Sequence, residues 1–79
     1  MTIQDILTIR PDVQFGTPVF KATRVPANYL LEFLEDGLSI ERFIDEFPSG
    51  TRQQAVDLLE WTNTFLKSPK IQELYESAA

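Results

Sequence analysis

The chain has 79 residues, of which 43% are hydrophobic and 11% aromatic. A chain of this length forms one domain with a modest core, and its composition argues against disorder. It contains no cysteine and no histidine, which excludes disulfides, thiolate nucleophiles, zinc–sulfur sites and the commonest general base.

The net charge of −5 is unevenly distributed. Residues 29–66 carry eight acidic side chains and two arginines, whereas residues 1–28 carry three basic and two acidic side chains. This acidic middle disfavours broad binding to phosphates and favours a basic partner, although a solvated helical surface explains it equally well. No apolar run approaches a membrane span, and the first residues lack the basic start of a signal peptide. We therefore expect a cytoplasmic protein without a membrane partner.

Residues 1–26 are expected to form an extended or β module. Alternation over Leu7–Arg10 predicts a short strand that Pro11 ends, although Ile3 and Ile6 could instead share a helix face with Leu7. Alternating apolar residues then continue the extended chain over residues 13–16.

The stretch Gly16–Pro26 separates this module from the helices. Gly16 is expected in a turn because glycine tolerates a positive φ, and Pro18 biases its neighbours toward extended geometry. Val19–Phe20 has the length of a short strand.

Residues 27–67 are expected to form three helices. Asn28 is a plausible N-cap of the first, although Pro26 could move the start earlier, and Gly37 is the expected residue just past its end. Ser39 caps the second, whose apolar stripe runs over residues 40–47. Pro48-Ser49-Gly50 then turns the chain.

The third helix begins with a capping box between Thr51 and Gln54 and continues to Lys67. Its apolar residues spread over more than half of the circumference, so either the last segment or another chain is needed to cover the second side. Residues 68–79 are expected to form that last segment. It is a short helix that Ser68 caps and that frays at residues 77–79.

A short helix, a three-residue turn with glycine and a longer capped helix are typical of a helix-turn-helix. The third helix would then present residues suited to the major groove: Thr51, Arg52, Gln53 and Gln54. The acidic surroundings count against DNA binding, and a purely structural three-helix core explains the pattern as well.

A second group combines aromatic and apolar side chains: Trp61, Phe65, Leu74 and Tyr75. These residues either pack between the third and fourth helices or form an interface for a partner or a second copy.

Signals for an enzyme are weak. The carboxylates fall mostly opposite the apolar stripes, as exposed helix charges do. The sequence lacks a phosphate-binding loop, a nucleophile elbow and metal-ligand spacing, so we expect no catalytic residue, no metal and no cofactor.

One further pattern is a resemblance to a family. The order Gly16-x-Pro18-Val19-Phe20-x-Ala22-Thr23-Arg24-Val25-Pro26 is similar to the signature Gly-Lys-Pro-Val-Ile-x-Gly-Thr-Arg-Ile-x-Val of the small prokaryotic family called domain of unknown function 433. The similarity continues through Leu30–Ser39, with its Asp-Gly-x-Ser hinge, and through Ile40–Pro48, covering roughly residues 5–66.

The resemblance implies a mainly α fold, in which a small β element precedes a homeodomain-like helix-turn-helix. It also implies a VapB-type antitoxin that neutralises a PIN-like ribonuclease toxin by contact and represses its own operon by DNA binding. The acidic middle suits a basic toxin. The alternative is an interaction module or homodimeric adaptor without DNA binding.

The residues that carry the resemblance are expected to be structural: Gly16, Pro18, Thr23, Arg24 and Gly37. We expect Thr23 and Arg24 to tie the strand to the helices. Ala22 replaces the usual glycine, which indicates that this position does not require a positive φ. Thr17 replaces the usual lysine, and Ala27 follows Pro26 where the family often has valine.

Overall fold

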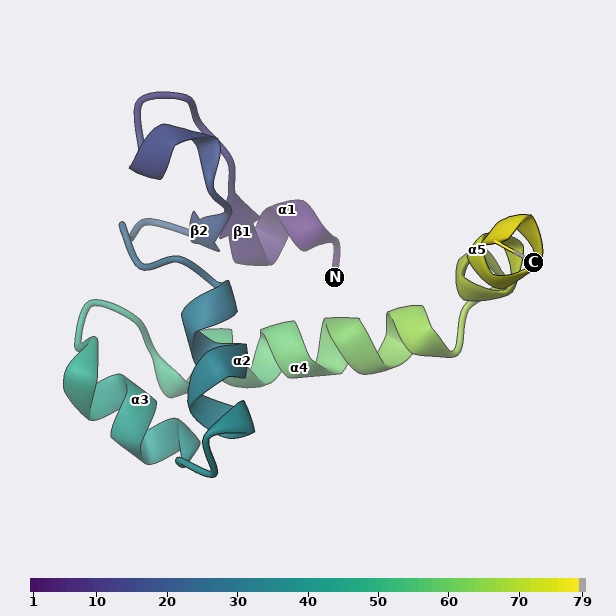
Figure 1. Cartoon of the computed structure of the whole chain (residues 1–79). Coiled ribbons are helices and arrows are strands. Elements are labelled where there is room, and N and C mark those ends of the chain that lie inside the picture. The colour runs from purple at the N-terminus through teal and green to yellow at the C-terminus, as the bar shows by residue number, and fades with distance from the viewer. Residues whose placement is uncertain (79) are drawn as a thin grey trace.

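The computed structural model describes residues 1–78 as a mainly helical chain with a two-stranded antiparallel sheet near its start. The elements in chain order are α1 (Ile3–Ile6), β1 (Leu7–Thr8), the 3₁₀ turn η1 (Gln14–Gly16), β2 (Val19–Phe20), α2 (Asn28–Glu35), α3 (Ile40–Glu46), α4 (Arg52–Leu66) and α5 (Pro69–Ala78). This order confirms the expected fold class (Figure 1).

The N-terminal module contains both elements that the sequence left as alternatives. Residues Ile3–Ile6 form α1, and the strand that follows is only Leu7–Thr8, shorter than the predicted Leu7–Arg10. Asp5 caps the start of this helix: its carboxylate accepts hydrogen bonds from the Thr2 N–H at 2.8 Å and the Thr2 hydroxyl at 3.1 Å. These bonds satisfy a free helix-end donor and lower the pKa of Asp5.

The sheet is short because each strand has two residues. Leu7 pairs with Phe20 and Thr8 with Val19. The expectation of extended chain over residues 13–16 is wrong: Gln14 and Phe15 adopt φ angles of 50° and 56° within η1. Phe15 is fully exposed, so its alternation with Val13 did not reflect a buried strand face.

The core forms where α1, β2, α2, α3 and α4 meet. Phe43 of α3 lies at its centre, 6.0 Å from the Phe20 ring and 5.4 Å from the Phe33 ring between centroids. The buried core residues are Ile6, Phe20, Val25, Ala27, Leu30, Phe43, Ala55 and Leu58. The apolar stripe predicted for the second helix is therefore confirmed as the side of α3 that faces the core.

Local signals fix the ends of α2 and α3. After α2, Gly37 has a φ of 81°. Its N–H donates to the Leu34 carbonyl, and the Leu38 N–H donates to the Phe33 carbonyl, as in a Schellman motif. The Ser39 hydroxyl accepts from the Arg42 N–H at 3.0 Å, confirming the predicted cap. Asn28 differs from its prediction: it is the first helical residue, and Ala27 is the cap.

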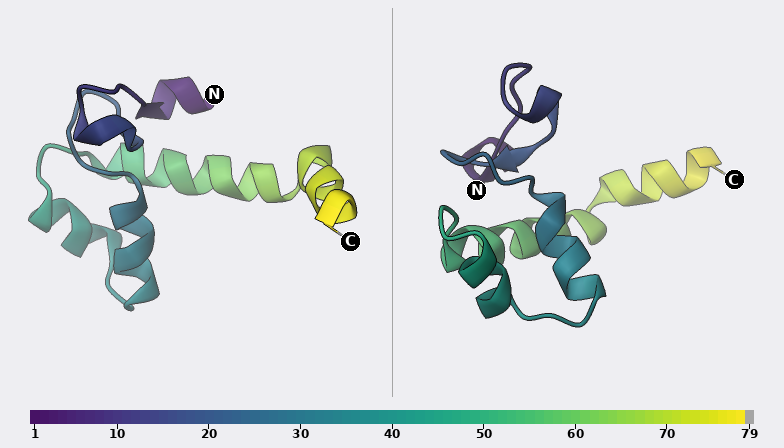
Figure 2. Two further views of the ribbon diagram at one scale, coloured as in Figure 1. Left: turned by 45° about the horizontal axis from the view of Figure 1, so that its top comes forward. Right: turned by 60° about the vertical axis from the view of Figure 1, so that its left-hand side comes forward.

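The last part of the chain extends away from this core. All three views of Figures 1 and 2 show the C-terminal half of α4 projecting beyond the other elements, with α5 turned at its far end. α5 buries no side chain and remains helical to Ala78, so the predicted fraying at Ser77 and Ala78 is not seen; Ala79 lies outside the described residues. Across residues 1–78, every helix is too short or too polar for a membrane span.

Candidate interaction surface

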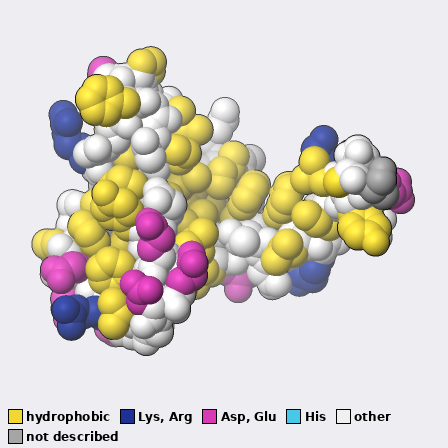
Figure 3. Space-filling view, viewed as in Figure 1, with side chains coloured by type: hydrophobic (Ala, Val, Ile, Leu, Met, Phe, Trp, Pro, Cys, Tyr) yellow, Lys and Arg dark blue, Asp and Glu magenta, His cyan; other side chains and the backbone are white. Residues whose placement is uncertain are grey.

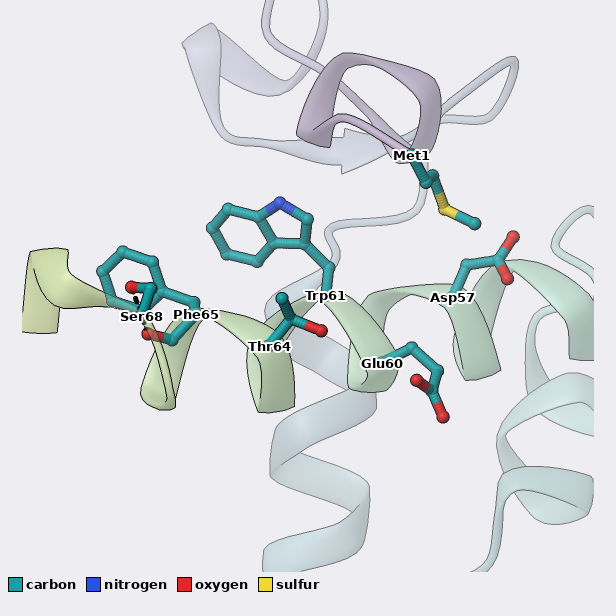
Figure 4. Close-up of a pocket in the computed structure, with 7 residues that line it drawn as sticks. All are labelled: Met1, Asp57, Glu60, Trp61, Thr64, Phe65 and Ser68. Atoms are coloured by element: carbon teal, nitrogen blue, oxygen red, sulfur yellow. Dashed lines mark hydrogen bonds between the residues drawn. The ribbon is translucent and has the colours of Figure 1, made fainter.

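A pocket of about 510 Å³ opens beside the middle of α4, below the start of α1 (Figure 4). Its lining residues are Met1, Asp57, Glu60, Trp61, Thr64, Phe65 and Ser68. All except Met1 lie on α4 or directly after it. The pocket is therefore one side of a helix that continues past the core.

Two aromatic rings form the apolar part of this pocket. Trp61 and Phe65 are one turn apart on α4, and their rings stack with centroids 5.4 Å apart and planes 15° apart. Trp61 also packs against the core, whereas Phe65 continues the stack outward along the helix. Figure 4 shows both rings on the same side of α4. The core thus anchors one end of an aromatic surface whose other end is open.

The polar edge of the pocket is acidic. Asp57 accepts a hydrogen bond from the Gln53 amide at 2.7 Å. Glu60 is exposed and has no ion pair among the residues that the structure describes. Figure 4 shows Glu60 pointing away from the two rings. A partner that covers the rings would therefore meet negative charge at the margin.

The last residue of α4 and three residues of α5 add further apolar side chains outside the pocket. Leu66, Leu74 and Tyr75 are 59%, 47% and 79% exposed, and Ile71 adds a half-buried side chain. We call the segment from Trp61 to Ala78 the arm. A ten-residue helix is marginal in water by itself, and α5 gains no buried side chain from its own chain. Within residues 1–78, the arm therefore carries an amphipathic helix whose apolar side chains Leu74 and Tyr75 stay exposed.

The four residues predicted for partner binding are only partly brought together. Trp61 and Phe65 share the pocket, whereas Leu74 and Tyr75 lie on α5 outside it. The alternative that all four pack between α4 and α5 is wrong because Tyr75 and Leu74 remain exposed. Leu66, at the end of α4, is a further exposed apolar side chain that was not among these four residues.

The four residues predicted to read DNA lie at the start of α4, and all make contacts within the chain. Thr51 and Gln54 form the predicted capping box: the Thr51 N–H donates to Gln54 Oε1 at 3.0 Å, and the Gln54 N–H donates to Thr51 Oγ1 at 3.1 Å. Gln54 Nε2 also donates to the Lys21 carbonyl at 2.8 Å. Gln53 donates to Asp57. The side-chain amide of Gln54 is therefore occupied by contacts within the chain and is not free to contact a DNA base.

Arg52 is tied to the preceding helix. Its Nε donates to Glu41 Oε1 at 3.0 Å across the α3–α4 turn, with both side chains 66% exposed. This hydrogen bond lowers the pKa of Glu41 below its ordinary value. Arg52 and Gln53 remain at the surface, but a DNA base would compete with carboxylate partners for each of them.

The signature stretch closes the loop between β2 and α2. The Thr23 hydroxyl donates to the Phe20 carbonyl at 2.8 Å and accepts from the Val25 N–H at 3.0 Å. The Pro18 carbonyl accepts from the Ala27 N–H at 2.9 Å. Thr23 and Pro18 therefore hold this loop against the start of α2, and Gly16 has the expected positive φ of 84°.

Two expectations for this stretch are wrong. Ala22 has a φ of 63°, because the tight loop between Phe20 and Val25 needs one left-handed residue, so this position does require a positive φ. Arg24 is exposed and makes no hydrogen bond or ion pair within residues 1–78. It does not tie the strand to the helices.

A second hollow was missed by sequence reasoning. Tyr29, Glu32, Phe33, Asp36 and Phe47 line a groove of about 250 Å³ between α2 and the end of α3. Four of these residues follow one face of α2 at the spacing i, i+3, i+4, i+7. The sequence shows that spacing, but exposed helix charges explain its carboxylates without a groove. We call this hollow the α2–α3 groove.

Comparison with known proteins gives one family and one relative of uncertain role. The family described as "Protein of unknown function (DUF433)" matches residues 2–61. Uncharacterized protein y4eO of Sinorhizobium fredii (strain NBRC 101917 / NGR234) is 39% identical over 46 residues, which cover 58% of this chain and 21% of that protein. The matched part thus spans about a fifth of that relative. No solved structure matches the chain.

Proposed function

The chain belongs to the family described as "Protein of unknown function (DUF433)", and we propose that it acts by binding another protein, as the antitoxin of a type II toxin–antitoxin pair. In this role it neutralises a PIN-like ribonuclease by contact. The observation that carries the proposal is the uncovered arm, whose apolar side chains continue outward from the core.

The arm has the composition of a binding surface. Aromatic side chains are enriched among the residues that dominate interface energies, and this surface contains Trp61, Phe65 and Tyr75. Trp61 is held in place by the core and by its stack on Phe65, so little ordering entropy opposes binding there. α5 supplies a helix that gains its burial from the partner.

The charge distribution supports a basic partner. The chain has a net charge of −5, and Asp57 and Glu60 stand at the margin of the aromatic pocket. A ribonuclease that binds RNA needs positive surface charge, and an acidic protein would be steered toward it. The choice of a PIN-like toxin as partner rests on the family resemblance.

Operator binding is the second part of this proposal. The capped start of α4 follows α3 through a short turn, and Arg52 and Gln53 are exposed there. To contact bases, Arg52 has to leave Glu41 and Gln53 has to leave Asp57. Replacing both by alanine should abolish salt-dependent binding to the chain's own promoter, measured by electrophoretic mobility, without unfolding the protein.

The test of toxin binding uses co-expression with a PIN-like ribonuclease, which is sought first among the genes that neighbour the gene of this chain. We expect the two proteins to co-elute from a sizing column and RNA cleavage by the toxin to stop at an equimolar ratio. The double variant Leu74→Ser and Tyr75→Ser should lose this complex, because it removes the exposed apolar side chains of α5.

Phe15→Ser is the matched control. Phe15 is fully exposed but lies in η1, far along the chain from the arm, so its loss should leave the complex intact. A wild-type chain that neither binds nor inhibits the toxin would contradict the antitoxin role. A homodimer that the Leu74 and Tyr75 changes dissociate would instead support the adaptor alternative.

A further inference from the structure

The α2–α3 groove combines aromatic walls with carboxylates on one helix face. Tyr29 and Phe47 have ring centroids 5.6 Å apart, and Phe33 and Phe47 have centroids 5.8 Å apart in an edge-on arrangement. Tyr29 is 40% exposed, so its ring borders both the groove and solvent. Figure 3 shows acidic side chains beside hydrophobic ones over α2 and α3.

The two carboxylates lie one helical turn apart, Glu32 on α2 and Asp36 directly after its last residue. Glu32 and Asp36 are at i and i+4, a spacing that puts them on the same side of the helix. The Asn28 amide donates to Glu32 Oε2 at 2.8 Å, which holds that carboxylate along the helix face. Both residues line the same hollow as the rings.

No positive charge of this chain compensates them. The sequence has no lysine or arginine between Arg24 and Arg42, and neither Glu32 nor Asp36 has an ion pair among residues 1–78. In addition, α2 ends at Glu35, so these carboxylates lie toward the negative end of the helix dipole, where acidic groups are unfavourable. Both carboxylates therefore remain available to a positively charged group of a partner.

We propose that the α2–α3 groove binds an arginine side chain of a basic protein partner. The planar guanidinium can stack on an aromatic face while its N–H groups donate to carboxylates. Tyr29 supplies the ring, and Glu32 and Asp36 supply the acceptors. This occupant matches both the aromatic lining and the negative charge of the groove, and it does not depend on which protein covers the arm.

The proposal is tested with a single arginine as the probe. Nα-acetyl-L-arginine amide is titrated into the isotope-labelled chain and followed by amide chemical shifts. We expect saturable shifts confined to residues 29–36 and to Phe47. The citrulline analogue has nearly the same shape without the charge, and it should produce no saturable shift.

Variants separate the groove from general electrostatic attraction. Glu32→Gln with Asp36→Asn should raise the apparent Kd for the arginine probe at least about fivefold. Asp12→Asn with Asp45→Asn makes the same change in net charge on exposed residues outside both the groove and the arm, and should leave the Kd unchanged. Tyr29→Leu keeps the wall apolar but removes the ring, and should also weaken binding.

Three results would overturn the proposal. One is an equal response to arginine and citrulline, which would show that charge is not recognised. Another is a shift pattern spread over all acidic residues, which would indicate screening alone. The third is an unchanged Kd in the Glu32 and Asp36 variant, whose fold is checked by the dispersion of its own amide spectrum.

Discussion

Gln54 Nε2, in the first turn of α4, donates a hydrogen bond to the backbone carbonyl of Lys21 over 2.8 Å. The same amide accepts from the Thr51 N–H through Oε1 at 3.0 Å. The Lys21 N–H in turn donates to the Ile6 carbonyl at 2.9 Å. One side chain therefore closes the cap of α4 and connects this helix to the loop after β2 and, through Lys21, to α1.

Replacing Gln54 by alanine should destabilise the protein by about 1–2 kcal/mol, because it removes half of a capping box and a hydrogen bond between distant segments. Urea unfolding followed by circular dichroism measures this loss. Gln53→Ala is the neighbouring control: its amide bonds only to Asp57 on the exposed face, so its cost should stay within about 0.5 kcal/mol. Equal losses for the two variants would contradict the role given to the Lys21 contact.

Ala22→Gly should stabilise the protein. Ala22 has a φ of 63°, and the left-handed conformation costs an alanine about 1–2 kcal/mol relative to glycine. The greater freedom of glycine in the unfolded chain cancels part of this gain. We therefore expect a net increase of about 0.5–1 kcal/mol in the free energy of unfolding, measured by the urea midpoint.

The control for Ala22 is the same substitution in a helix. Ala55 is fully buried within α4, and Ala55→Gly should lower stability by about 1 kcal/mol or more through helix propensity and lost packing. Opposite signs for the two substitutions are the expected result. A lower urea midpoint for Ala22→Gly would show that the loop does not hold the alanine in a strained conformation.

Thr23 and Arg24 are adjacent in sequence but should respond differently to alanine. The Thr23 hydroxyl bonds to Phe20 and to the buried Val25, so Thr23→Ala should cost about 1–2 kcal/mol. Arg24 is exposed and without a polar contact within residues 1–78, so Arg24→Ala should change stability by less than about 0.5 kcal/mol. Thermal unfolding of both variants measures the difference, and a large loss for Arg24 would contradict its placement.

The features that sequence could predict are those decided within a few residues. Ser39, Thr51 and Gly37 act through bonds to neighbours three positions away, so their residue types and spacing are sufficient to predict them. The apolar stripe of α3 was equally visible because its period matches a helix. These signals needed no knowledge of the rest of the chain.

The features that sequence missed depend on distant segments. The left-handed Ala22 follows from how Phe20 and Val25 close their loop, and alanine itself gives no sign of it. The contact of Gln54 with Lys21 joins residues 33 positions apart. The α2–α3 groove required Phe47 to be placed against Tyr29. The amphipathic pattern of the last helix was clear, but a pattern cannot tell whether the chain folds back over it.

The ion pair between Glu41 and Arg52 should make the α3–α4 connection sensitive to acid. The Arg52 hydrogen bond lowers the pKa of Glu41 in the folded protein. The Glu41 carboxylate therefore binds a proton less tightly in the folded state than in the unfolded state. This contribution to stability is fully present above the ordinary pKa of a glutamate, and it is lost as the pH falls through the lowered value.

Below the ordinary glutamate pKa, the free energy of unfolding of Glu41→Gln should therefore fall less steeply with decreasing pH than that of the wild type. Urea midpoints measured from neutral pH down to acid reveal this difference. Glu60→Gln removes the same charge from a carboxylate without an ion pair among residues 1–78 and should keep the wild-type slope.

Glu41→Gln also frees Arg52 from its only carboxylate partner within residues 1–78, so promoter binding through α4 should strengthen in this variant. Unchanged binding, in a variant with the flattened profile, would remove Arg52 as a DNA-reading residue.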